Sequence, residues 1–477
     1  MSLSNPLPFK ERVEQALNDP FLRQSLKNAQ ARFREGKQKA GQALGNLEEW
    51  RTRAEAIRRH TIEHLDYYLD LFATNVEKNG GTVFFAETEQ EAVEYLIRLA
   101  KAKQAQTVIK SKSMVSEETH VNHRLEEIGV EAIESDLGEY IIQLAKEMPS
   151  HIIAPAIHKN RKQIAQLFSA VAGEELPEDT SALTRFARHQ LRDKFLNANI
   201  GISGCNFAVA ETGSIVLVSN EGNARLTTTL PKTHVVMMGM ERIVPTWEDL
   251  DAVLSLLPRS ATGQKITSYV TALTGPRREN DQDGPEEMHV IIVDNGRSNA
   301  LGTDYQSILH CIRCGACLNV CPVYRHIGGH AYGSVYPGPI GAVLTPVLKG
   351  FDQWEELPYA SSLCGACTEA CPVKIPLHDM LIDLRRDEVG QKRSPWIERL
   401  AFRLFGAAMK YPALYRLGLK MAKYLLRPQA GEEGFLNKGP GPLKAWTQAR
   451  DFPAPAPESF REWWERQGRH GGEPHGR

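Results

Sequence analysis

Seven of the eight cysteines lie in one short part of the chain, in two runs that each end in Cys-Pro. The first run has the spacing C-x2-C-x2-C-x3-C-P and contains Cys311, Cys314, Cys317 and Cys321. This spacing is typical of bacterial ferredoxin-type iron–sulfur sites, in which the fourth cysteine ligates the other cluster. The spacing therefore predicts iron–sulfur clusters and, with them, electron transfer.

The second run is one cysteine shorter and contains Cys364, Cys367 and Cys371. Because the last cysteine of each run serves the opposite site, the two runs together predict two neighbouring 4Fe-4S clusters. The predicted ligands are Cys311, Cys314, Cys317 and Cys371 for the first cluster, and Cys321, Cys364 and Cys367 for the second.

The second cluster lacks a fourth cysteine, and Ser361 occupies the missing position of the motif. A serine oxygen is a poorer ligand than a thiolate, because iron–sulfur clusters prefer soft sulfur. Three arrangements remain open. The second site holds a 4Fe-4S cluster with a non-cysteine ligand, which we favour, or a 3Fe-4S cluster, or it is completed by the eighth cysteine, Cys205.

Structural zinc and disulfides are the alternatives to clusters. Paired C-x2-C sequences also bind zinc, but a zinc site needs four ligands, and Cys317, Cys321 and the two Cys-Pro endings fit clusters better. No secretion signal is recognisable at the N-terminus, so we expect the thiols to lie in a reducing cytoplasm.

Length and charge limit the classes of function. The 477 residues predict two or three domains, and 57 basic against 58 acidic side chains give no global indication of nucleic-acid binding. No long uncharged apolar segment predicts a transmembrane helix. We expect a cytoplasmic protein whose contact with the inner face of the membrane is at most peripheral.

The elements that position the cysteines divide into four predicted regions. Residues 1–70 predict a helical arm packed on the main domain, with a helix start at Asp19-Pro20. Residues 71–298 predict an α/β domain, residues 303–385 a helical ferredoxin-like domain, and residues 386–477 a helical region with an irregular tail from about 428.

The α/β domain begins with apolar runs separated by helical patterns, which predict a parallel sheet with right-handed crossovers. A hairpin or tight bend and further strands follow. The expected strands are 82–85, 107–109, 130–133, 151–154, 207–210, 214–218, 235–238, 269–273 and 290–293.

Two further features concern binding. Three motifs together predict a site for an anionic or nucleotide-like ligand, although each alone is a weak indication. They are Lys110–Ser113 after a predicted strand, the glycine-rich Gly201–Asn206 around Cys205, and Glu211–Ser214 at a strand junction, and none of their residues is assigned as catalytic. The amphipathic basic helices expected at 396–405 and 414–426 more often cover a domain or partner than a membrane surface.

The motifs Lys110–Met114, Glu211–Ser214 and Tyr336–Gly341, with the two cysteine runs, resemble the lactate utilization protein B family over nearly the whole chain. The short second run is similar to that family's own pattern. The resemblance implies an α/β LUD domain of the NagB/RpiA/CoA-transferase-like class, an all-α ferredoxin-like domain with two clusters, and a family-specific C-terminal region.

The resemblance also implies a function. It implies a bacterial system of three proteins that oxidises L-lactate to pyruvate for growth on lactate, with this chain as a non-catalytic electron-transfer subunit and the A and C proteins as partners. In the alternative, the LUD domain is itself catalytic or binds lactate or an acyl-CoA-like ligand. The resemblance does not identify the downstream electron acceptor.

Overall fold

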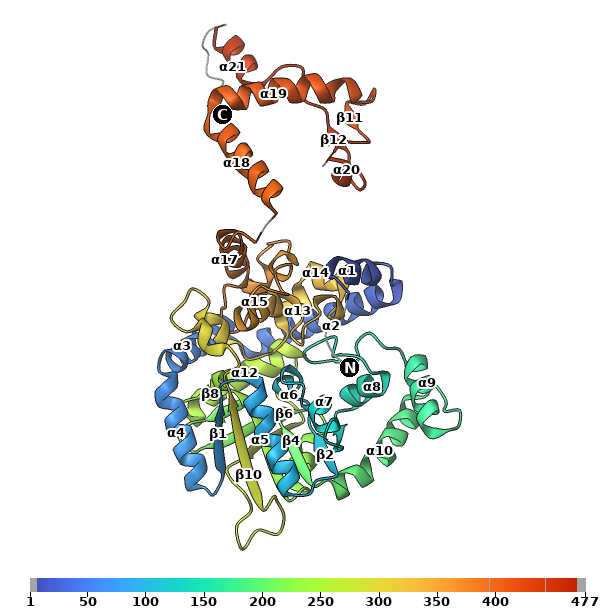
Figure 1. The fold of residues 1–477 in the computed structure, drawn as a ribbon, viewed down its shortest axis with the longest axis vertical. Coiled ribbons are helices and arrows are strands. Elements are labelled where there is room, and N and C mark those ends of the chain that lie inside the picture. The colour runs from blue at the N-terminus through green and yellow to red at the C-terminus, as the bar shows by residue number, and fades with distance from the viewer. Residues whose placement is uncertain (1–6, 394, 442, 470–477) are drawn as a thin grey trace. The chain divides into compact units, whose positions relative to one another are not determined.

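The computed structural model describes residues 7–393, 395–441 and 443–469. It consists of two compact units, Met1–Glu388 and Val389–Arg477, each of which is described by itself (Figure 1). The first unit contains the predicted arm, the α/β domain and the cysteine runs.

A six-stranded sheet forms the centre of the α/β domain, and every neighbouring pair of strands in it is parallel. The predicted parallel sheet is therefore confirmed. Its order is β1 (Thr82–Ala86), β10 (Glu287–Val293), β7 (Thr233–Gly239), β4 (Ile200–Ser203), β2 (Thr107–Lys110) and β3 (Glu131–Glu134).

Strand β7 shows how the sheet is buried on both faces. Val235 and Met237 pack with α5 (Glu89–Ala102) and α7 (Val121–Glu126), whereas the alternate residues Val236 and Met238 face the opposite core. Successive side chains of a strand point to opposite faces, so a strand covered on both sides is continuously apolar.

A smaller sheet covers the second face, in the order β8 (Ile243–Val244), β5 (Phe207–Val209), β6 (Ser214–Ser219) and β9 (Tyr269–Leu273). Strands β5 and β6 are antiparallel, with Phe207 opposite Val216, which confirms the predicted hairpin. The same core contains apolar residues of α4 (Leu65–Lys78) and α12 (Trp247–Ala261).

The strand predicted at 151–154 is wrong. These residues form bends, in which the ring nitrogen Nδ1 of His151 accepts hydrogen bonds from the backbone N–H groups of Ile153 (3.0 Å) and Ala154 (3.2 Å). Ile152 is buried in the core shared with the cysteine domain. The segment is apolar because it packs against that domain.

The remaining helices of the α/β domain pack on both central and outer strands of the sheet, α11 on β4 and α8 on β3. Three of them, α8, α9 and α10, form a separate core with Ile109 and Ile133. The helices are α6 (Met114–Glu118), α8 (Leu137–Ala145), α9 (Arg161–Ala172), α10 (Thr180–Asn197) and α11 (Asn223–Thr229), with short 3-10 turns η1 (Met240–Arg242) and η2 (Arg297–Ala300).

The N-terminal helices are α1 (Phe9–Leu17), α2 (Pro20–Leu44) and α3 (Leu47–Glu63). Asp19 caps α2 by accepting a hydrogen bond from the N–H of Leu22 at 2.9 Å, as the Asp-Pro start predicts. Leu26 and Phe33 bury one face of α2. This helix packs against helices of the cysteine domain as well as against α12.

The cysteine domain lies at the carboxyl ends of the parallel strands (Figure 1). It is built from short helices, which together with the α/β sheet confirm a mixed architecture. They are η3 (Gln306–His310), α13 (Ala316–Val320), α14 (Pro322–Ile327), η4 (His330–Tyr332), α15 (Gly338–Lys349), η5 (Leu357–Tyr359), α16 (Ala366–Ala370) and α17 (Leu377–Gly390).

The second unit contains the two amphipathic helices predicted from the sequence, α18 (Trp396–Lys410) and α19 (Pro412–Leu426). Its tail is more regular than predicted, because α21 (Phe460–Arg469) is a helix of 10 residues. The short elements are η6 (Arg427–Gln429), β11 (Phe435–Leu436), α20 (Leu443–Trp446) and β12 (Phe452–Pro453). Within the described ranges no helix is both long and apolar enough to span a bilayer.

Candidate iron–sulfur site

The two cysteine runs enter their helices with the same backbone geometry. Gly315 (φ 73°) and Gly365 (φ 76°) take the left-handed conformation immediately before α13 and α16. Two residues earlier, Arg313 (φ 57°) and Leu363 (φ 53°) take it as well. Glycine adopts this conformation without steric cost, whereas the two side-chain-bearing residues are strained. The repeated geometry indicates two equivalent ligand loops.

Ser361 occupies the position in the second loop that Cys311 occupies in the first. The N–H of Arg313 donates to the sulfur of Cys311 at 3.4 Å, and the N–H of Leu363 donates to Oγ of Ser361 at 3.1 Å. The side-chain oxygen of Ser361 thus takes part in the same local hydrogen bond as the sulfur of Cys311.

The four thiols predicted for the first cluster lie together. Burial, together with the neighbouring Cys371 and Cys311, raises the pKa of Cys314 to about 12. Burial also raises the pKa of Cys317 well above its ordinary value, again with contributions from Cys311, Cys314 and Cys371. Deprotonation of these buried, neighbouring thiols is costly unless a bound metal neutralises the thiolate charges.

The three thiols predicted for the second cluster form a second group. Burial raises the pKa of Cys367 to about 11, and Cys321 and Cys364 contribute to the increase. Cys364 is exposed, and a hydrogen bond from the backbone of Ala366 lowers its pKa. Cys317 and Cys367 interact across the two groups, so the groups are neighbours.

The cysteine sulfurs are not arranged as a preformed site for a single zinc ion. Zinc–sulfur bonds of about 2.3 Å would place the sulfurs of one tetrahedral zinc site about 3.8 Å apart. Among residues 7–393, 395–441 and 443–469, no three cysteine sulfurs lie within 4.8 Å of one another. The donor set therefore fits iron–sulfur clusters, and which sulfur binds which iron stays a prediction.

The N-terminal helices supply contacts to the cysteine loops that the sequence did not predict. Gln30 donates to the carbonyl oxygens of Leu318 (2.7 Å) and Cys321 (3.1 Å). Arg51 donates to the carbonyl oxygen of Cys371 at 2.9 Å. These two side chains therefore hold the C-terminal ends of α13 and α16, the two helices that carry cysteines.

Lys37 of α2 brings a positive charge to the first thiol group. Its ammonium group donates to the carbonyl oxygen of Ala370. Desolvation lowers the pKa of Lys37, while the nearby Cys314, Cys371 and Cys317 oppose that shift. A cation at this place would stabilise the negative charge of a cluster and its thiolates.

Arg58 of α3 connects three segments behind the first cysteine loop. Its guanidinium donates to the carbonyl oxygens of Glu241, Ile243 and Leu309, the last at 3.0 Å. Burial lowers its pKa to about 10, and repulsion from Arg242 adds to this. Arg58 therefore ties the arm to both the α/β domain and the cysteine domain.

The predicted ligand motifs of the α/β domain are only partly brought together. Ser111–Met114 and Gly204–Asn206 line one cavity of about 440 Å³, together with Arg242 and Arg313. Lys110 instead is fully buried and pairs with Glu134 at 2.6 Å and Glu117 at 3.0 Å. The Glu211–Ser214 motif forms the turn between β5 and β6.

Cys205 lies on this cavity and interacts with Arg242 and Glu241. Burial raises its pKa to about 12. None of the cluster cysteines contributes to that shift, and the structure does not place Cys205 with the second thiol group. A 4Fe-4S cluster with a non-cysteine ligand, or a 3Fe-4S cluster, fits this geometry better than ligation by Cys205.

Two thiol groups on short helices, joined to a parallel α/β domain, define an iron–sulfur protein with a LUD domain. The LUD domain family matches residues 69–293, the 4Fe-4S dicluster domain matches residues 307–375, and the C-terminal domain of lactate utilisation protein B matches residues 386–469. These matches follow the order of the elements along the chain.

The chain belongs to the lactate utilization protein B family. A lactate utilization protein B of Shouchella clausii is 59% identical over 97% of this chain and 98% of its own length. Those of Oceanobacillus iheyensis and Bacillus cereus are 55% and 56% identical over 96% of this chain and 96% of their own lengths. A solved DUF162 family protein of Deinococcus radiodurans covers 48% of this chain at 14% identity, and its TM-score of 0.27 supports no statement about the fold.

Proposed function

We propose that this chain is the electron-transfer subunit of a bacterial system that oxidises L-lactate to pyruvate, and that it is needed for growth on lactate. The observation that carries the proposal is the pair of thiol groups, because each combines cysteines from both runs. Iron–sulfur clusters supply one-electron transfer when they are bound.

The residues of this chain hold and shield the clusters in this proposal. Cys311, Cys314, Cys317 and Cys371 hold the first, and Cys321, Cys364 and Cys367 hold the second, with Ser361 in the fourth position. Burial of Cys314, Cys317 and Cys371 excludes water from the first site, whereas Cys364 is exposed. The exposed side of the second site is the natural place for electron exchange with a partner.

The partners we propose are the A and C proteins of the same system. Relatives of this chain are named lactate utilization protein B, which supports a role beside the other proteins of that system. In this proposal the cysteine domain supplies the redox centres. No residue of this chain is assigned to the chemistry of lactate in this proposal.

Anaerobic purification and replacement of one ligand test the proposal. The wild-type chain should contain iron and acid-labile sulfide for about two clusters. Cys311→Ala should reduce the cluster content and lactate-dependent electron flow in the mixture of the three proteins, whereas Cys205→Ala should retain both. A colourless wild-type protein without iron would contradict the proposal.

A second candidate function is binding of a small carboxylate in the LUD domain. Arg242 and Arg313 both line the cavity. Three of their nitrogen atoms, Nε of Arg242 and Nε and Nη1 of Arg313, are buried and have no hydrogen-bond partner in the described part of the chain. Burial lowers the pKa of Arg242, and repulsion from Arg313 lowers it further. An anion between the two guanidinium groups would satisfy these donors and remove the repulsion.

Calorimetric titration with lactate and with pyruvate tests this second candidate. Binding to the isolated chain that Arg242→Gln weakens about tenfold or more would support it, since a charged hydrogen bond contributes about 1.5–3 kcal/mol. If neither acid binds the isolated chain, the lactate site belongs to another subunit.

A further inference from the structure

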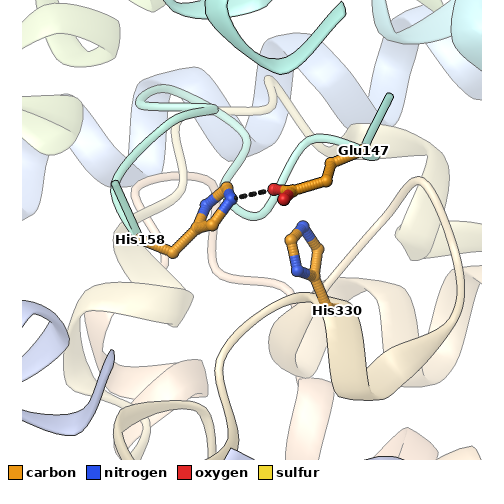
Figure 2. Close-up of side chains that lie close together, drawn as sticks. All are labelled: Glu147, His158 and His330. Atoms are coloured by element: carbon orange, nitrogen blue, oxygen red, sulfur yellow. Dashed lines mark hydrogen bonds and ion pairs between the residues drawn. The ribbon is translucent and has the colours of Figure 1, made fainter. Parts of the chain in front are cut away.

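A group of three side chains outside the cysteine domain's thiol groups has the composition of a metal site. Glu147 and His158 lie in the segment that follows α8, and His330 lies in η4 between the two cysteine runs. One ligand atom from each lies within 4.8 Å of those of the other two. Figure 2 shows the His158 ring and the His330 ring directed toward the Glu147 carboxylate.

A hydrogen bond holds the His330 ring against the segment that contains Glu147. Its Nε2 lies 2.7 Å from the carbonyl oxygen of Met148. A carbonyl oxygen can only accept, so Nε2 carries the proton and Nδ1 carries the lone pair. A histidine that ligates a metal usually donates its other N–H to such an acceptor.

His158 and Glu147 form the other half of the group. Nε2 of His158 lies 2.6 Å from Oε2 of Glu147, and Lys159 donates to Oε1 of the same carboxylate. The two oxygens of the Glu147 carboxylate therefore lie against His158 and Lys159.

A polar atom without a partner is the second observation at this place. The His158 side chain is only 10% exposed, and its Nδ1 is buried without a hydrogen-bond partner in the described chain. The His158 and His330 rings are 4.5 Å apart at an interplanar angle of 70°. Two imidazoles and a carboxylate thus converge in a half-buried place.

We propose that Glu147, His158 and His330 bind one divalent first-row transition metal ion, separate from the iron–sulfur clusters. Two imidazoles and a carboxylate suit zinc and non-haem iron. The ion would replace the proton shared by His158 Nε2 and Glu147 Oε2. Metal–ligand bonds of about 2.0–2.2 Å place the ligand atoms of a tetrahedral site about 3.3–3.6 Å apart. Nε2 of His158 and Oε2 of Glu147, which are 2.6 Å apart, would therefore separate to admit the ion.

The ion would join the α/β domain to the loop between the cysteine runs. Next to the site, the hydroxyl group of Tyr324 donates to the carbonyl oxygen of Ser150 at 2.8 Å. Gly329 packs so closely on the same oxygen that an added Cβ would lie 1.9 Å from it. The site therefore lies on a tight junction, and its role is to fix the position of this loop.

Zinc titration of the purified, cluster-loaded full chain tests the proposal. Calorimetry should show one Zn²⁺ bound per chain, and zinc X-ray absorption should show nitrogen and oxygen ligands without sulfur. His158→Ala and His330→Gln should weaken binding by at least about tenfold. Glutamine at 330 can still donate to the Met148 carbonyl, so this variant should keep its fold and clusters.

His326→Ala is the matched control, because this exposed histidine in α14 contacts the carbonyl oxygen of Pro322 and lies outside the group. It should bind zinc as the wild type does. Two results would overturn the proposal: a sulfur shell around the zinc, or zinc binding that is absent or is unchanged in His158→Ala and His330→Gln. The group would then be a hydrogen-bonded junction without a metal.

Discussion

At the scale of single residues, Lys37 is the cation that α2 brings to the first thiol group. We predict that Lys37→Gln lowers the reduction potential of the first cluster by on the order of tens of millivolts, because a nearby positive charge favours the more negative reduced state. Redox titration followed by electron paramagnetic resonance measures this. Lys39→Gln is the control, since the Lys39 side chain is 73% exposed. Equal potentials in all three proteins would contradict the role of Lys37.

A second residue-scale prediction concerns Arg297, which lies buried between two carboxylates. It contacts Glu118 at 2.8 Å and Glu241 at 2.7 Å. Removing one partner of such a pair costs about 3–5 kcal/mol. We therefore expect Arg297→Met to lower the free energy of unfolding by that amount near neutral pH. Arg277→Met, in an exposed pair with Glu286, should cost at most about 1 kcal/mol.

The pH dependence of this loss has a definite sign. Despite burial, Arg297 holds the pKa of Glu118 below its ordinary value of 4.5, and the pKa of Glu241 is about 2. In the wild type these carboxylates contribute stability above about pH 4.5, which is lost as the pH falls through their folded pKa values. In Arg297→Met, burial raises the pKa of Glu118. Protonation of Glu118 then removes the unpaired buried charge and reduces the loss of stability. The difference between the two melting temperatures should shrink from pH 8 to pH 5, and a constant difference would be inconsistent with this account.

The sequence predicted the thiols but not the residues that surround them. The spacing within each cysteine run is a local pattern and can be read from the sequence. The motif also states that the last cysteine of each run ligates the other cluster, which predicts the grouping of Cys311 with Cys371. Gln30, Lys37 and Arg51 lie about 280–330 positions away from the backbone atoms that they contact. No local pattern reports such pairs, and basic residues on a helix are equally typical of a solvated face.

At the scale of elements, periodicity predicted the parallel strands and failed at 151–154. An apolar run has the same appearance whether its partner is a neighbouring strand or another domain. Here Ile152 packs in the shared core, and the backbone N–H groups of Ile153 and Ala154 are satisfied by the His151 ring instead of a strand. The segment thus belongs to the junction with the cysteine domain.

The tightness of that junction gives an element-scale prediction. An alanine Cβ at 329 would lie 1.9 Å from the carbonyl oxygen of Ser150, so Gly329→Ala must push the two segments apart. Such overpacking typically costs about 1–3 kcal/mol. Gly222→Ala is a matched control, because both glycines have helical backbone angles (φ −79° and −74°) and nothing lies within 4 Å of a Cβ at 222. Chemical denaturation should separate the two variants, and equal stabilities would contradict the close contact.

At the scale of the whole molecule, the two units differ in how they are stabilised. Among the described residues, the three hydrophobic cores are made of residues of the first unit. In the second unit, neither α18 nor α19 contains a buried residue, and apolar side chains such as Phe402 and Leu404 are 66% and 63% exposed. Helices with so little burial of their own gain stability from a surface that covers them.

A chain that ends after residue 393 tests this division. Because it keeps the three cores and all seven clustered cysteines, we expect it to retain its iron content and its melting temperature. It should lose association with the proposed A and C proteins, measured by size-exclusion chromatography of the mixture, because the exposed apolar helices are absent. In the full chain, Phe402→Glu with Leu404→Glu should weaken the same association while the clusters remain. Loss of the clusters on truncation would show instead that the second unit stabilises the first, and unchanged association would place the partner contact on the first unit.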